Sequence, residues 1–454
     1  MDRVSEEGNR KKKQNLIERS SSQFEQYNGP DFISNLPDTI LTSIISLLPL
    51  REAARTSILS KNWIDLWKSI PFLLLDESIA PKDPNGRDDL YPEEKWIKAV
   101  QCILMARRDP IMSCSIISRF LSIKPLDADH FLLCLSKIGV EKLHLVNSSV
   151  DAFCIPASAF SILSLKSLLL DRCALLEIPT QFEAFASLKA ICFNFVISTD
   201  DVIARLVSSC PVLESLGLHY CTGVKEFRIS APKLLFLDIS VFVPARVRLI
   251  DAPHLEHSDF SFNFPPSWRS SSWGVSESVM LVELLRDMSH VKRLSLSWND
   301  AFAKCLSAGD VPSSLPTEHL LQNLTILSMK VSFIDGMVFP FLSFLLRSCP
   351  RLQELVIECY GDETVRYGPS KLKSNYWEQQ QPFECLASSL EAIQMKRMHS
   401  DCAYEMAFVE FLLMKAGLLK TMIMTHRGSG EVLKELCLLQ WASPHIQLTL
   451  TPSK

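Results

Sequence analysis

Cysteine and histidine are the residue types in this 454-residue chain best suited to chemistry, as nucleophiles, general bases or metal ligands. The chain has 14 Cys and 10 His, and neither type forms the closely spaced pairs typical of zinc sites. His144, His219 and His257 fall in or beside apolar strand-like segments, which favours structural histidines over ligands. We therefore expect reduced, mostly buried cysteines and no metal or other cofactor.

Motifs of known catalytic mechanism are missing from the sequence. It contains no GxSxG, HExxH, Walker loop or GxGxxG. Gly428-Ser429-Gly430 stands alone and indicates a turn before a helix that begins near Glu431. No sequence pattern therefore supports the competing interpretation that the chain is an enzyme. We expect a chain that acts by binding.

Composition excludes several classes of partner. Lys and Arg total 47 against 51 Asp and Glu, a net charge of -4, so no basic field indicates nucleic acid. The polar first thirty or so residues lack the apolar core of a secretory signal, and no apolar run reaches the roughly eighteen residues of a membrane span. We expect an intracellular protein, in the nucleus and/or cytoplasm. Arg10-Lys11-Lys12-Lys13 suits either a nuclear import signal or a solvated tail.

Elements that could position a binding surface begin with an apolar block at residues 35–71. Pro37 suits the first turn of a helix, and Pro49 ends that helix. The residues that share one face are Ile40, Ile44 and Leu47 in the first helix and Trp63, Leu66 and Trp67 in the last. A domain of about forty residues buries little surface, so exposed apolar side chains there indicate an obligate partner.

This block resembles an F-box. The matching residues are Leu36-Pro37-Asp38, Leu47-Leu48-Pro49, Arg55-Thr56-Ser57, Leu59-Ser60-Lys61, Trp63 and Trp67. Asn62 and Ile64 depart from the plant-type pattern, which usually has basic residues there. The resemblance implies docking to a Skp-type adaptor and, through it, to the cullin of a ubiquitin ligase. The adaptor contacts that it implies are Leu36, Pro37, Ile40, Ile44 and Leu59, while Trp63 and Trp67 hold the helices together. The alternative is a small helical cap on the segment that follows.

An apolar triplet at i, i+3 and i+5 recurs along most of the chain. Copies begin at Val140, Leu165, Leu188, Leu213, Leu234, Val291, Leu324, Leu352, Leu390 and Leu419, with a weaker one at Leu255. Positions i+3 and i+5 point the same way from a strand, and the first copies lie about 21 to 25 residues apart, as in a leucine-rich repeat. The pattern predicts an α/β fold, a curved solenoid with parallel strands and helical returns. One ordinary α/β domain is the alternative.

Residues 377–424 resemble the FBD domain of plant F-box proteins. The matching features are Trp377, Pro382, Glu384-Cys385-Leu386, Ser389-Leu390-Glu391 and a helix with Phe408, Phe411 and Leu412. The segment predicts strand, helix and strand, and we expect it to cap the open end of the solenoid. Together these features resemble the plant F-box/FBD/leucine-rich-repeat protein family.

Three irregular insertions interrupt the repeats, and solenoid insertions often gather on the binding face. The residues there that suit an interface hot spot are Trp268, Arg269, Trp273, Arg366 and Tyr367. These residues are therefore candidates for target contact. The alternative, which we favour, is that the insertions fold back over the ends of the solenoid.

We predict five segments along the chain. They are a disordered polar leader at 1–30, a three-helix F-box at 31–76, a linker into the solenoid at 77–110, the solenoid with its insertions at 111–376, and the FBD-like cap at 377–454. The expected function is the non-catalytic substrate receptor of a Skp-cullin-F-box ubiquitin ligase, which presents an unknown protein target. The alternative is a scaffold whose F-box does not engage a cullin complex.

Overall fold

The structure of the protein is a computed structural model. It describes residues 33, 36–81, 92–107, 109–242, 245–263, 275–298, 320–333, 338–360, 376–381, 383–399, 402–427, 436 and 439–452. Contacts divide the chain into two compact units, Met1–Ile70 and Pro71–Lys454. Each unit is described by itself.

The first unit is helical. Its elements are α2 (Asp38–Ile45), α3 (Leu50–Arg55) and the 3-10 helices η1 (Thr56–Ile58), η2 (Lys61–Trp63) and η3 (Leu66–Ser69). Pro37 and Pro49 occupy the N-cap positions of α2 and α3 with extended backbone, as their fixed φ favours. The single last helix expected around Trp63 is therefore two short 3-10 turns.

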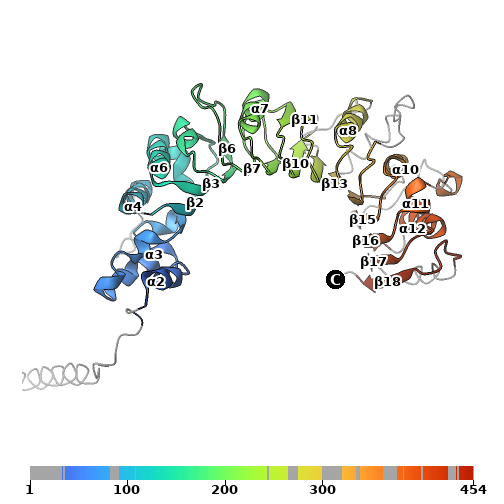
Figure 1. Cartoon of the computed structure of the whole chain (residues 1–454), viewed down its shortest axis with the longest axis horizontal. Coiled ribbons are helices and arrows are strands. Elements are labelled where there is room, and N and C mark those ends of the chain that lie inside the picture. The colour runs from blue at the N-terminus through green and yellow to red at the C-terminus, as the bar shows by residue number, and fades with distance from the viewer. Residues whose placement is uncertain are drawn as a thin grey trace, which may run out of the picture. The chain divides into compact units, whose positions relative to one another are not determined.

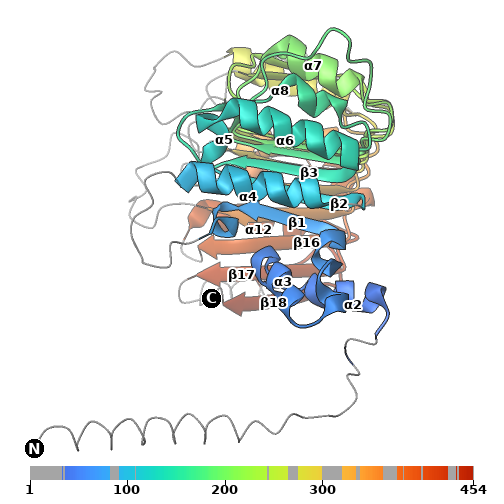
Figure 2. The same ribbon diagram turned by 90° about the vertical axis from the view of Figure 1, so that its left-hand side faces the viewer.

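The second unit contains one parallel sheet, whose strands run side by side in Figure 2. Its strands, in spatial order, are β1 (Phe72–Asp76), β2 (Ile111–Ser118), β3 (Val140–Asn147), β5 (Ser167–Asp171), β7 (Ala190–Asn194), β8 (Ser215–His219), β10 (Phe236–Phe242), β12 (His257–Asn263), β13 (Arg293–Trp298), β14 (Ile326–Val331), β15 (Glu354–Cys359), β16 (Ala392–His399), β17 (Thr421–Arg427) and β18 (Gln447–Pro452). Two small sheets pair β4 (Phe153–Cys154) with β6 (Cys173–Ala174) and β9 (Glu226–Ser230) with β11 (Arg246–Asp251).

Helices of the second unit lie on one face of this sheet (Figure 1). They are η4 (Glu77–Ile79), α4 (Pro92–Ala106), α5 (Phe120–Ile123), α6 (Pro125–Ile138), η5 (Ala157–Ser161), α7 (Asp200–Ser208), α8 (Val275–Asp287), α10 (Phe339–Ser348), η6 (Trp377–Gln379), α11 (Glu384–Ser388) and α12 (Ala403–Lys415). The opposite face of the sheet is called the helix-free face below. This parallel-strand α/β arrangement is consistent with the predicted solenoid.

Strand register stacks equivalent positions of successive repeats. Cys114, Leu143, Leu168, Ile191, Leu216 and Leu237 form one buried row across the sheet. In the weak copy Ser258 takes this position between Leu237 and Leu294 and is itself buried. Side chains of a strand point alternately to its two faces. The residues that alternate with this buried row therefore point away from the helices and form the helix-free face.

The sheet extends beyond the predicted repeats at both ends. Before the first predicted copy, β1 and β2 pair with Leu73 opposite Cys114. β1 lies inside the range predicted for the F-box, and the structure places it in the second unit. At the far end β16 and β17 continue the same sheet, and β18 forms its last strand. Pro452, which cannot donate a backbone hydrogen bond, suits that edge.

Gly223 is the glycine whose replacement we expect to be most harmful. Its φ is +84°, and a Cβ there would lie 2.4 Å from the carbonyl oxygen of Ser198. Gly223→Ala should therefore lower the free energy of unfolding by about 2 to 3 kcal/mol, measured from urea-unfolding midpoints. Gly139→Ala is the matched control, because φ is +87° there and nothing lies within 4 Å of the added Cβ. Equal losses would show that backbone strain alone sets the effect.

Candidate interaction surfaces

The first unit has a small complete core. Its buried side chains are Leu41, Ile45, Ala53, Trp63, Leu66 and Ile70, with Leu36, Leu50 and Trp67 packed against them. Leu41 and Ile45 are fully buried because they share the inward face of α2 at i and i+4. The core therefore closes without the other apolar side chains of the unit.

Those other apolar side chains are exposed. They are Ile33, Ile40, Ile44, Leu47, Leu48, Ile58, Leu59 and Ile64. Ile40 and Ile44 are 47% and 43% exposed and lie one turn apart on α2, with Leu47 just after the helix. Apolar side chains concentrated on so small a unit are typical of a protein-binding surface. We call Ile40, Ile44 and Leu47 the α2 stripe.

The predicted adaptor contacts fall into two structural groups. Ile40, Ile44 and Leu59 are exposed and available to a partner. Leu36 packs partly buried against the core, so a change there would disturb the fold as well as any contact. Pro37 is exposed, and its carbonyl oxygen accepts hydrogen bonds from the N–H groups of Ile40 (2.9 Å) and Leu41, a main-chain contact that a side-chain replacement keeps.

The predicted core residues and target contacts are placed as follows. Trp63 is 6% exposed inside the core, and Trp67 packs partly buried against it. Trp268, Arg269, Trp273, Arg366 and Tyr367, the predicted target contacts, lie outside the described residues. The structure therefore does not test these five positions.

An aromatic ladder that the sequence analysis missed lies at the ends of strands β7, β8 and β10. The ring centroids of Phe195 and Tyr220 are 5.3 Å apart and stacked, and those of Tyr220 and Phe242 are 5.1 Å apart. Phe195 remains 50% exposed. Aromatic side chains with such exposed faces are enriched in interface hot spots. We call Phe195, Tyr220 and Phe242 the aromatic ladder.

Backbone conformation at the ladder is unusual. Arg172, Phe195 and Tyr220 each directly follow a strand and each have φ of 52°. Their N–H groups donate to carbonyl oxygens of the next repeat, for example from Tyr220 to Ser240 at 2.7 Å. Residues other than glycine seldom adopt this left-handed region, and each costs of order 1–3 kcal/mol. The sequence signal for this conformation is weak: a large residue directly follows each of the strands β5, β7 and β8.

Beside the ladder, the helix-free face carries carboxylates. Nδ1 of His219 lies 3.7 Å from Oδ1 of Asp238, and Asp238 pairs in register with Asp259. Burial raises the pKa of Asp238 above its ordinary value; His219 opposes this shift and Asp259 adds to it. Gly217 lies opposite Asp238 in the register and leaves room for these side chains. The group can accept hydrogen bonds and attract a cation.

Burial suppresses the reactivity of the buried cysteines. Burial raises the thiol pKa of Cys114, Cys173, Cys210, Cys221 and Cys385 to about 12, so these thiols stay protonated near neutral pH. Cys102 and Cys154 are exposed. In the described ranges no three His, Cys, Asp or Glu side chains gather as a metal site requires. No described helix is long and apolar enough to cross a membrane.

Comparisons with known proteins match three parts of the chain. The F-box domain family matches residues 33–75, and the FBD family matches residues 378–424. The family described as FBD-associated F-box protein At5g56370, LRR repeats, matches residues 128–267. These ranges contain the helical unit, the central strands of the sheet, and the segment from α11 to the first part of β17.

The chain is similar to F-box proteins of Arabidopsis thaliana. F-box/FBD/LRR-repeat protein At1g13570 is 28% identical over 92% of this chain and 98% of its own length. F-box/FBD/LRR-repeat protein At3g52680 is 26% identical over 81% of this chain and 79% of its own length. Putative FBD-associated F-box protein At5g56440 is 31% identical over 47% and 50%. The chain therefore combines an F-box, leucine-rich repeats and an FBD, and it is similar over most of its length to plant F-box/FBD/leucine-rich-repeat proteins.

Proposed function

We propose that this chain is the substrate-recognition subunit of a Skp-cullin-F-box ubiquitin ligase, acting in the nucleus and/or cytoplasm. The observation that carries the proposal is the α2 stripe. Its side chains are exposed although the core of the small F-box unit is complete without them. Exposure of such apolar side chains to water is unfavourable in free energy, and a permanent partner that buries them removes this contribution.

Docking to the Skp-type adaptor would use a few anchors. A specific protein interface buries about 1,200–2,000 Å², and a few central side chains supply most of its binding energy. Ile40, Ile44 and Leu59 have the required exposure. The sequence of α2 contains one charged residue, Asp38, so binding should depend weakly on salt.

Target binding would fall to the solenoid. The aromatic ladder and the Asp238–Asp259 pair lie on or beside the helix-free face, where parallel strands hold them at fixed spacing. A rigid surface of this kind loses little conformational entropy when a target binds. Ubiquitin transfer would then follow from proximity to the conjugating enzyme, with no catalytic group from this chain.

Reconstitution with purified partners tests the proposal. The full-length chain, a plant Skp-type adaptor and a cullin N-terminal domain are mixed and separated by size-exclusion chromatography with light scattering. We expect one complex whose mass is that of a 1:1:1 assembly. A folded chain that elutes apart from the adaptor would instead support the scaffold interpretation.

A further inference from the structure

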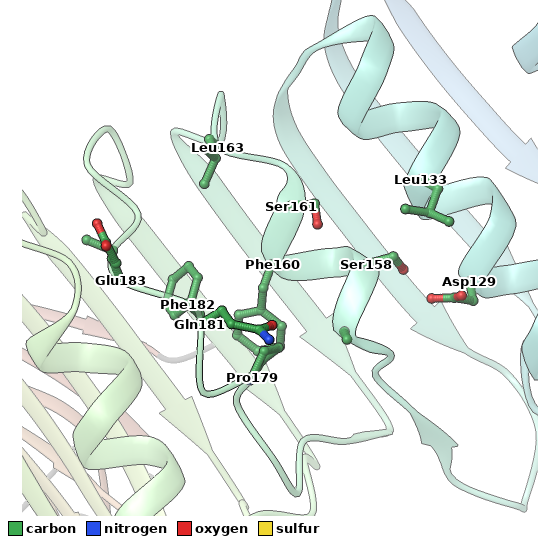
Figure 3. Close-up of a pocket in the computed structure, with 12 residues that line it drawn as sticks. Asp129, Leu133, Ser158, Phe160, Ser161, Leu163, Pro179, Gln181, Phe182 and Glu183 are labelled. Carbon is green, nitrogen blue, oxygen red and sulfur yellow. The ribbon is translucent and has the colours of Figure 1, made fainter.

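A pocket of about 660 Å³ opens between α6 and the return segment 175–189 (Figure 3). It exists because neighbouring returns differ in size. α6 has 14 residues and α7 has 9, whereas the return between β3 and β5 holds only the 5-residue η5. The return between β5 and β7 has no helix in residues 175–189, all of which are described. Short returns beside long helices leave a hollow on the helix-covered side.

Aromatic rings form one wall of the pocket. The centroid of the Phe160 ring lies 5.1 Å from that of Phe182, and the Phe182 and Phe185 centroids are 4.7 Å apart. Phe160 is 7% exposed, and Phe185, which is 1% exposed and does not line the pocket, packs against Phe182 from behind, so packing fixes the wall. Leu133 and Leu163 also line the pocket and are 39% and 62% exposed. The apolar wall thus continues into exposed leucines.

Ser158 supplies an unsatisfied polar group. It lines the pocket and is 6% exposed, and its Oγ has no hydrogen-bond partner among the described residues. Figure 3 shows it between Phe160 and Asp129. A buried hydroxyl without a partner costs free energy, and a polar atom of a ligand would remove that cost.

Charge at the pocket has one sign. Asp129 of α6 and Glu183 of the return segment line it, and neither forms an ion pair with a described residue. Arg205 of α7 donates hydrogen bonds to the carbonyl oxygens of Ile178 and Pro179 and is not part of the lining. A complementary ligand is therefore cationic and apolar at once.

We propose that this pocket binds a protein segment in which Lys or Arg stands next to a large apolar side chain. The apolar side chain lies against Phe160 and Phe182, the cation faces Asp129 and Glu183, and a backbone polar atom pairs with Ser158. An open hollow continued by exposed leucines suits a chain segment that extends beyond the pocket. Binding of such a segment is argued from the pocket alone. That the segment belongs to a ubiquitination target rests on the proposed receptor role.

Peptide binding to the full-length chain tests the site. The probes are two fluorescein-labelled pools of peptides of about ten residues, with Lys or Arg beside Leu, Phe or Trp in one and Glu or Asp at the charged position in the other. We expect saturable anisotropy changes with the basic pool only, weaker at high salt. The double variant Asp129→Asn, Glu183→Gln should weaken this binding about three- to tenfold, the range for two partly exposed ion pairs.

Control variants separate the pocket from general effects. Asp127→Asn with Glu177→Gln makes the same charge change on the same two segments outside the lining and should leave binding unchanged. Leu163→Ser should weaken binding because Leu163 is an exposed wall residue. Ser158→Ala should weaken binding while thermal stability stays equal or rises, which a purely structural serine would not do.

Three outcomes would overturn the proposal. They are absence of saturable binding by the basic pool, equal weakening by both charge-changed double variants, and preference for the acidic pool. Sedimentation that shows a concentration-dependent dimer lost in Asp129→Asn, Glu183→Gln would assign the pocket to a second copy of the chain. Adaptor binding is measured in the same preparations and should be normal throughout, so failure here is distinguishable from failure of the receptor role.

Discussion

Replacing Ile40 and Ile44 together by glutamate is expected to weaken binding of the Skp-type adaptor by about a hundredfold or more. Two apolar anchors are lost and two charges are placed in the interface, and each hot-spot residue contributes roughly 2 kcal/mol or more. Both side chains are almost half exposed in the free unit, so its core should remain intact. Titration calorimetry with purified adaptor gives the affinity.

The matched control is Thr39→Glu with Ser43→Glu. These positions have the same spacing on α2, are exposed, and lie a quarter turn or so away from the stripe. Adaptor affinity should change little, and the thermal unfolding profile should be unchanged in both double variants. Equal affinity of the Ile40→Glu, Ile44→Glu variant and the wild type would remove the α2 stripe from the interface.

Glu405→Gln is expected to stabilise the second unit at pH 8 and to have no such effect at pH 4. Glu405 is 3% exposed at the start of α12, and burial raises its pKa to about 7 from an ordinary 4.5, although N–H of His399 donates to it at 2.8 Å. The folded state therefore holds the proton more tightly than the unfolded state. Stability from this group is fully present below pH 4.5 and is lost as the pH rises through about 7.

The size of that loss follows from the two pKa values. A shift of this size corresponds to about 3 kcal/mol, and glutamine keeps an acceptor for His399 without the charge. Thermal unfolding of both proteins from pH 4 to pH 8 should show melting temperatures that diverge above pH 4.5. Glu410→Gln, a half-buried position on the same helix, serves as the control. A variant less stable than the wild type at pH 8 would contradict the prediction.

Local residue patterns predict much of the fold. The triplet Val140, Leu143 and Leu145 predicts a strand with one buried face, because alternate side chains of any strand point the same way. Repeating it at nearly constant spacing leaves stacking of the repeats as the way to bury those faces. The F-box and FBD segments were identified for the same reason, since their residues lie close together in the chain.

Strands with atypical residues were harder to predict. Cys114 fills a repeat position in β2, and β1 falls inside the range that the sequence assigns to the F-box. Their place in the sheet follows from pairing with the next strand. Likewise Ser258 occupies a buried position that its polarity argues against, because Leu237 and Leu294 on either side fix the register of β12.

The sequence by itself determined the order of the F-box, leucine-rich-repeat and FBD segments and the strands of the central repeats. Only the tertiary structure decided that Glu405 is buried, that Phe195 and Tyr220 stack, and that a pocket lies between α6 and residues 175–189. Each depends on contacts between repeats more than twenty residues apart or on the relative size of neighbouring returns. Burial is a property of what packs over a side chain, and that covering is supplied by distant segments.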